Sequence, residues 1–254
     1  MLLAIDVGNT NIVLGCFDGD KILVRERVST NQQATDLEYA TRIRMALDMH
    51  NISRHEINEA IISSVVPSVT NTLKMAVQKY LSCTPVIVGP GIKTGLSILI
   101  DNPAQLGSDL VVDAVAGITE YPVPLIIIDM GTATTFSIVD AQKRYRGGVI
   151  MTGMAVSTEA LVSRTSQLPR IAFEAPKHII GTNTVDCMKS GIMYSTACAL
   201  DGMIDRIEEE LGEKCTVVAT GGLAGTVTPL CRKDIILDDD LLLKGLHAIY
   251  EKNR

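Results

Sequence analysis

Two short acidic segments are the parts of this sequence best suited to phosphate chemistry. The segment 6–10 (DVGNT) ends one apolar run, and the segment 129–135 (DMGTATT) ends another. A carboxylate beside backbone amides and a hydroxyl suits a magnesium-bound phosphate. A plain tight turn with a solvated aspartate is the competing interpretation of each segment alone. In a two-domain clamp, such a pair could hold the phosphate tail of a nucleotide.

Asp109 is the candidate general base. It follows Gly107 and Ser108 and precedes an apolar, helix-like stretch at 110–118. A carboxylate at the start of a helix is often only a cap. Alternatively, it takes the proton from an attacking hydroxyl while a γ-phosphoryl group is transferred in line.

Two further loops each allow two interpretations. The glycine-rich segment 219–225 (ATGGLAG) either offers a close backbone surface to an adenosine or serves tight packing. The segment 181–184 (GTNT) precedes a long helical stretch and either caps that helix or contacts a polar substrate. Spacing alone does not decide either case.

Composition excludes several classes of function. The net charge is −6 without a Lys/Arg stripe, and aromatic residues make up only 4%, which disfavours nucleic-acid binding. Neither the Walker phosphate loop nor the dinucleotide fingerprint occurs. The six scattered cysteines indicate buried thiols in a reducing compartment. With no signal peptide and no apolar run of about 20 residues, we expect a cytoplasmic protein outside the membrane.

Secondary-structure signals show how these residues are positioned. Strands are expected at 2–5, 11–17 and 21–28, with a hairpin at Asp18-Gly19. A capping box, Thr35 to Glu38, opens a helix. A strand at 60–65, a helix at 68–81 and a strand at 86–88 follow. This alternation predicts parallel additions to an antiparallel meander.

The same order then repeats. The segment 125–132 (LIIIDMGT) restates 2–9 (LLAIDVGN), so that Asp6 and Asp129 lie 123 positions apart. A strand at 134–139, a third entering 147–148, a long helix at about 184–211 and a strand at 215–220 continue the copy. The sequence therefore predicts two duplicated α/β domains, 1–118 and 119–254, with Pro122 and Pro124 interrupting the pattern near the boundary.

Taken together, these motifs resemble the type III pantothenate kinases, which belong to the actin and hexokinase superfamily. The resemblance runs from Met1 to about Asn253 and rests on seven segments: 6–10, 102–109, 129–135, 147–148, 168–169, 181–184 and 219–223. It implies two ribonuclease H-like, actin-like ATPase domains, each a mixed five-stranded sheet with helices on both faces. It also implies a homodimer that phosphorylates pantothenate with ATP to 4'-phosphopantothenate, the first step of coenzyme A synthesis.

The resemblance also implies site residues. Asp109 would be the catalytic base, Asp129 a ligand of a monovalent cation (K⁺ or NH₄⁺), and Asp6 a ligand of Mg²⁺-ATP. ATP binding is implied for Asp6, Val7, Gly8, Asn9, Thr10, Asn11, Ile12, Val13 and Thr132. The pantothenate pocket is implied for Ile100, Gly107, Ser108, Asp109, Leu110 and Thr184.

Three positions depart from the family pattern. Leu110 stands where Arg is common, Asp113 where Asn is common, and Ile100-Asp101 where an aromatic residue is frequent. Losing a cation and gaining a carboxylate disfavours an anionic substrate. Two alternative functions follow: a kinase of the same fold for another small hydroxylated metabolite, or a nucleotide-binding regulatory protein without turnover.

Overall fold

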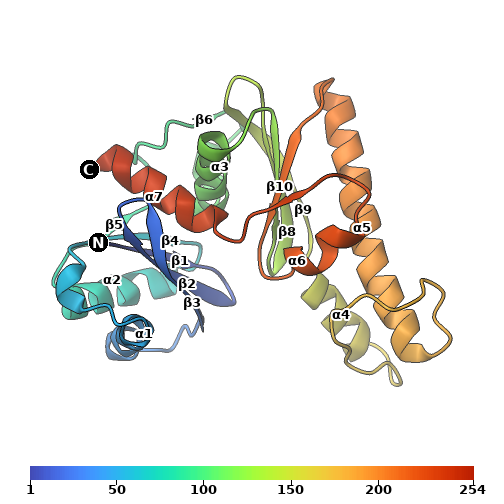
Figure 1. Cartoon of the computed structure of the whole chain (residues 1–254), viewed down its shortest axis with the longest axis horizontal. Helices are drawn as coiled ribbons and strands as arrows, with labels where there is room; N and C mark the ends of the chain where they lie inside the picture. Colours follow the sequence, from blue (N-terminus) through green and yellow to red (C-terminus); the bar gives the residue numbers. More distant parts are fainter. The chain divides into compact units, whose positions relative to one another are not determined.

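Contacts divide the chain into two units in the computed structural model, which describes all 254 residues (Figure 1). Unit 1 comprises residues 1–96, 101–119 and 241–254, and unit 2 comprises residues 97–100 and 120–240. The last helix, α7 (Leu241–Asn253), packs in unit 1, whereas the sequence pattern predicts it in the second domain, 119–254. Unit 1 is therefore assembled from three separate stretches of chain.

The sheet of unit 1 has the order β3-β2-β1-β4-β5. The first three strands form the expected antiparallel meander, and β4 and β5 then add in parallel beside β1. The strands are β1 (Leu2–Val7), β2 (Asn11–Asp18), β3 (Lys21–Ser29), β4 (Glu59–Ser64) and β5 (Val86–Ile87).

Helices cover both faces of this sheet (Figure 1). Because side chains alternate along a strand, Leu3, Ile5 and Val7 of β1 join the core beneath α1 (Asp36–Met49) and α2 (Pro67–Leu81). On the opposite face, α7 packs on β1 and β4 and against α3 (Ser108–Glu120). Two single 3₁₀ turns, η1 (Arg54–Glu56) and η2 (Pro103–Gln105), precede β4 and α3.

The sheet of unit 2 repeats this topology with one addition. Its order is β11-β10-β7-β8-β9-β6, in which β7, β8 and β9 form the meander and β10 and β11 are parallel to β7. The sixth strand, β6, pairs in parallel with β9 and forms that edge of the sheet, so the expected count of five strands is one too low. The strands are β6 (Ser97–Ile98), β7 (Leu125–Met130), β8 (Ala133–Val139), β9 (Arg144–Thr152), β10 (Thr216–Thr220) and β11 (Ile236–Leu237).

The core of unit 2 lies between this sheet and a long helix. Ile126, Ile128 and Met130 of β7 share a cluster with Met193 and Leu200 of that helix, α5 (Thr184–Leu211). The shorter helices are α4 (Met154–Ser163), α6 (Ala224–Val227) and the 3₁₀ turn η3 (Thr228–Leu230). The predicted helix at 184–211 is confirmed at both ends.

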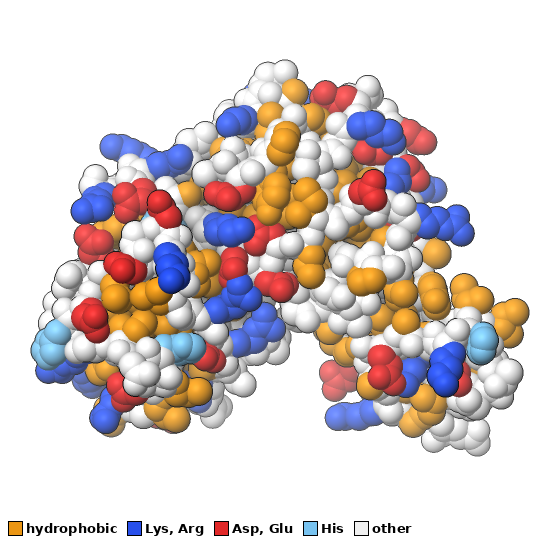
Figure 2. Space-filling model, in the orientation of Figure 1, with side chains coloured by type: hydrophobic (Ala, Val, Ile, Leu, Met, Phe, Trp, Pro, Cys, Tyr) orange, Lys and Arg blue, Asp and Glu red, His pale blue; other side chains and the backbone are white.

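Surface charges of both signs are interspersed on the face shown in Figure 2, which has no continuous field of Lys and Arg. None of the helices is both long enough and apolar enough to cross a membrane.

The capping box of α1 yields a first prediction. The Thr35 amide donates to Glu38 Oε2 at 2.7 Å, and the Glu38 amide donates to Thr35 Oγ1 at 3.4 Å. We expect Thr35→Ala to lower the free energy of unfolding by about 1 kcal/mol, measured by urea denaturation, because it leaves an amide without its cap. Thr41→Ala, which removes only a bond to the Leu37 carbonyl in the same helix, is the control. Equal effects of the two changes would contradict a special role for the cap.

Candidate functional site

Asp6 lies near the carboxyl ends of the parallel strands in unit 1. Its register partners are Val13 in β2 and Ser63 in β4, and its side chain is buried. Ligands of open α/β sheets bind outside the carboxyl ends of the strands. This edge is therefore where a binding site is expected.

The loop after Asp6 is held from behind by the neighbouring strands. The Gly8 amide donates to the Asn11 carbonyl at 3.0 Å, and the Thr30 hydroxyl donates to the Gly8 carbonyl at 2.7 Å. The Thr30 amide donates to the Thr10 carbonyl at 2.9 Å. Asn9 and Thr10 are exposed, so the loop presents an amide and a hydroxyl side chain at the surface.

Val7 and Ile12 flank this loop but belong to the core of unit 1. Their side chains are fully buried among apolar neighbours, so only their backbone atoms are suited to contact a nucleotide. Among the residues 6–13 that are expected to bind ATP, Val7 and Ile12 are therefore not suited to contact it through their side chains.

Asp109 lies in the first turn of α3 and is half-buried. Its Oδ1 accepts a hydrogen bond from the Leu110 amide at 2.8 Å. A Cβ atom at position 107 would lie 2.4 Å from the same oxygen, so a side chain there would have to displace this carboxylate. Burial raises the pKa of the Asp109 carboxyl, and the amides at positions 109 and 110 oppose this shift only in part. A raised pKa suits a general base, because it strengthens the attraction for the proton.

Ser108 ties the start of α3 to the end of β4. Its hydroxyl donates to the Ser64 carbonyl at 3.0 Å and accepts from the Ser63 hydroxyl at 3.1 Å. Because Ser63 is also the register partner of Asp6, the Asp6 loop and the segment 107–110 lie at the same edge of the sheet. The Ser108 side chain is thus engaged in positioning the helix.

Asp129 occupies the equivalent place in unit 2. Its register partners are Thr135 in β8 and Thr220 in β10, which match Val13 and Ser63 in unit 1. The Gly131 amide donates to the Ala133 carbonyl at 3.0 Å. Two residues separate β7 from β8, whereas three separate β1 from β2, so the repeat is one residue shorter here.

Two glycines allow close approach to this second loop. A Cβ atom on Gly153, which precedes α4, would lie 2.2 Å from the Thr132 carbonyl oxygen. Gly221, with a φ of +96°, would place a Cβ atom 2.5 Å from Asp129 Oδ1. The segment 219–225 therefore has a packing role at Gly221, and the helix it opens is only four residues long. Gly153 was not identified from the sequence, because nothing local distinguishes it.

The remaining expected pocket residues lie in unit 2. Ile100 follows β6, and Thr184 is the first residue of α5 and is exposed. The cap of α5 is Asn183, whose side chain accepts from the Asp186 amide at 3.0 Å. Helix capping therefore belongs to Asn183 and not to Thr184. Asp113, one of the departures from the family pattern, is buried within α3.

A metal ion suits these residues only as a partner of phosphate. No group of three or more His, Cys, Asp or Glu side chains is arranged to hold a metal. Mg²⁺ that arrives with a nucleotide needs only one or two carboxylates, because phosphates and waters complete its shell. Asp6, a single buried carboxylate at a strand end, fits this limited role.

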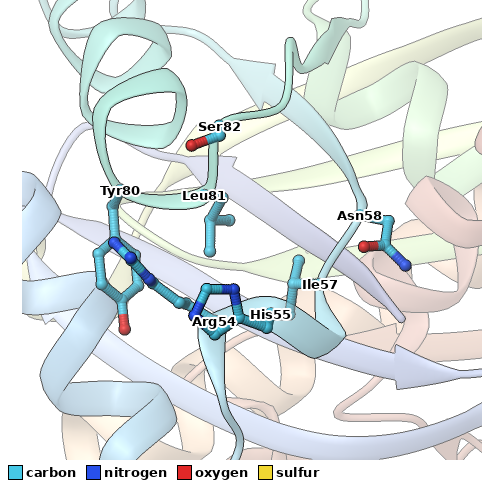
Figure 3. A pocket seen from close by; sticks show the side chains of 7 residues that line it. All are labelled: Arg54, His55, Ile57, Asn58, Tyr80, Leu81 and Ser82. Atoms are coloured by element: carbon cyan, nitrogen blue, oxygen red, sulfur yellow. The ribbon is translucent and has the colours of Figure 1, made fainter.

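A small open cavity of about 150 Å³ lies elsewhere in unit 1 (Figure 3). It is lined by Arg54, His55, Ile57, Asn58, Tyr80, Leu81 and Ser82. Asn58 precedes β4, so the cavity lies at the amino end of that strand, away from Asp6 and Asp109. It contains none of the expected site residues.

Known proteins resemble this chain over its full length. A family model described as type III pantothenate kinase matches residues 2–206. Type III pantothenate kinases from an Exiguobacterium species (strain AT1b) and from Halalkalibacterium halodurans are 45% and 44% identical, with complete coverage of both chains in each case.

Component A of (R)-2-hydroxyglutaryl-CoA dehydratase from Acidaminococcus fermentans is a similar solved structure. The two chains align with a TM-score of 0.58 at 15% sequence identity, and the alignment covers 100% of this chain and 99% of the dehydratase component. This likeness concerns the fold alone, which is the duplicated α/β architecture of the actin-like ATPases and sugar kinases. The sequence matches identify the protein more narrowly: the chain belongs to the type III pantothenate kinase family.

Proposed function

We propose that this protein transfers the γ-phosphoryl group of ATP to the primary hydroxyl of pantothenate, which forms 4'-phosphopantothenate and ADP and begins coenzyme A synthesis. The observation that supports pantothenate as the substrate is the 45% identity, over the full length, to a type III pantothenate kinase. The Asp6 loop and Asp109 at one sheet edge support phosphoryl transfer as the reaction.

The loops after β1 and β7 bind the phosphates of ATP. In unit 1, backbone amides of the loop 8–10 and the side chains of Asn9 and Thr10 are suited to phosphate oxygens. In unit 2, Thr132 occupies the corresponding loop. Mg²⁺ that arrives with ATP would neutralise charge on the phosphates, and Asp6 would be its protein ligand. Asp129 would be a ligand for a monovalent cation, K⁺ or NH₄⁺.

Asp109 orients the hydroxyl of pantothenate and accepts its proton. The hydroxyl oxygen forms a bond to the γ-phosphorus while the bond to the ADP oxygen breaks. Gly107 leaves room for the carboxylate, and Ser108 holds the helix that carries it. Leu110 follows the base in the chain, and the family resemblance assigns Leu110 of unit 1, and Ile100 and Thr184 of unit 2, to pantothenate binding.

The first test is a coupled assay for ADP release with ATP, Mg²⁺ and K⁺. Pantothenate-dependent release supports the proposal, and release only with another hydroxylated metabolite would move the assignment to that substrate. Absence of stimulated release, with ATP binding retained, would favour the nucleotide-binding regulatory function instead.

Substitution of the base is the sharpest test of mechanism. We expect Asp109→Asn to lower kcat by about 100- to 10,000-fold, because the amide cannot accept the proton. ATP binding, measured by calorimetry, remains unchanged. Asp20→Asn is the matched control, since Asp20 is an exposed carboxylate in the same unit and in the hairpin that follows β2. Unchanged turnover in Asp109→Asn would remove this residue from the mechanism.

The pH profile provides a second test. A base is active when deprotonated, so kcat/KM falls as pH decreases through the pKa of Asp109. Burial raises that pKa above the ordinary aspartate value of 3.8, so the fall begins at a higher pH than for an exposed aspartate. An acid limb at the ordinary value would contradict the assignment, provided that circular dichroism shows the protein to be folded throughout.

We also propose that the protein forms a homodimer through unit 2. Apolar side chains are exposed on β9 and α4, in the segment before α5 and at the start of α5, and many gather at the lower right of Figure 2. They are Ile150, Val156, Leu161, Ile179, Ile180 and Val185. Isolated exposed apolar residues are common, but a group of this size on one unit favours an interface.

Light scattering tests the dimer. We expect twice the chain mass of 27.3 kDa for the wild type and a shift towards monomer for Ile180→Asp, whose side chain is 81% exposed. A charge placed in an apolar interface opposes association. Leu37→Asp in unit 1, at a site 62% exposed, is the control. A wild-type mass equal to that of one chain would refute the dimer.

A further inference from the structure

The C-terminal helix contacts the helix that carries the base. Gly245 of α7 lies directly against Val112 of α3, and a Cβ atom at position 245 would be 2.1 Å from the Val112 carbonyl oxygen. It would also lie 2.8 Å from the carbonyl carbon and from Cγ1 of Val112. Because the obstacle is backbone, no rotamer change can relieve it. The two helices are in contact only because residue 245 has no side chain.

The opposite side of α7 packs just as closely against the sheet of unit 1. A Cβ atom on Gly15 of β2 would lie 2.7 Å from Leu243 Cδ2, and Leu243 is fully buried. Leu241, Leu246 and Ile249 are buried along the same helix. The helix α7 therefore fills the space between the sheet of unit 1 and α3, and it has little freedom to move away from α3.

The helix α3 has two supports close to Asp109. One is Ser108, which is bonded to Ser63 and the Ser64 carbonyl at the end of β4. The other is the contact of Gly245 with Val112, which lies three residues, or about one turn, after Asp109. The first support fixes the start of the helix, and the second fixes its distance from α7.

We propose that Gly245 is a positioning residue for catalysis: by allowing α7 to touch α3, it sets where the Asp109 carboxylate stands relative to the phosphate-binding loop of unit 1. This inference rests on the proposed role of Asp109 as the base. A side chain at position 245 pushes α3 away from α7 and displaces the carboxylate. A displacement of 1 Å at a reacting group can lower a rate by about 100-fold.

Gly245→Ala is the direct test. We expect kcat per folded protein to fall by about 10- to 100-fold, while the KM for ATP stays at the wild-type value. The matched control is Gly191→Ala, which also adds a methyl group to a helical glycine but has no atom within 4 Å of the new Cβ. A variant that keeps wild-type kcat, or one that changes only the KM for ATP, would overturn the proposal.

A measurement without substrate separates this inference from the proposed function. In protein labelled with ¹³C at aspartate carboxyls, the Asp109 signal is identified by its loss in Asp109→Asn and then titrated. We expect its pKa to move towards the ordinary aspartate value in Gly245→Ala, because the displaced carboxyl is less buried, and to stay constant in Gly191→Ala. An unchanged titration overturns the positioning role, whether or not pantothenate proves to be the substrate.

Leu243→Val is the second variant, for use if Gly245→Ala does not fold. It shortens the side chain that contacts Gly15, and so weakens the packing of α7 against the sheet without introducing a clash. We expect a lower kcat with an unchanged KM for ATP. A lowered melting temperature accompanied by wild-type kcat would show that α7 only stabilises unit 1, and would overturn the inference.

Discussion

The parallel pairing of β1 with β4 is the constraint on which the site in unit 1 depends. Its register sets Asp6 opposite Ser63, and Ser63 in turn contacts Ser108 at the start of α3. One ladder of backbone hydrogen bonds therefore places the Asp6 loop and the segment that carries Asp109 at the same sheet edge. A slip of one residue would turn Asp6 towards the apolar core, where an ionised carboxylate is costly.

Local sequence signals predicted much of this fold. The capping box at Thr35, the hairpin at Gly19 and the full extent of α5 follow from side chains within a few positions of one another. The repeat of strand, aspartate and glycine predicted the duplicated topology, because the two copies have the same order. It did not predict the additional strand β6, whose two residues carry too little pattern to identify.

Other features depend on contacts between distant segments and so were not evident. The close approach of Gly153 to the Thr132 loop, and of Gly221 to Asp129, exists only after folding. A glycine in the sequence shows that the position has no side chain, but it does not show which other segment packs against it. The sequence likewise indicated Asp109 as a candidate base. Its partial burial and its raised pKa were not evident, because they come from the packing around α3.

The assignment of α7 to unit 1 has a consequence for synthesis on the ribosome. All strands of unit 1 emerge early, but α7 follows the whole of unit 2. Until it arrives, the face of the sheet around Gly15 lacks its covering helix, and nascent chains expose apolar surface that holdase chaperones can bind. Unit 1 can therefore complete its packing only after every strand of unit 2 has been synthesised.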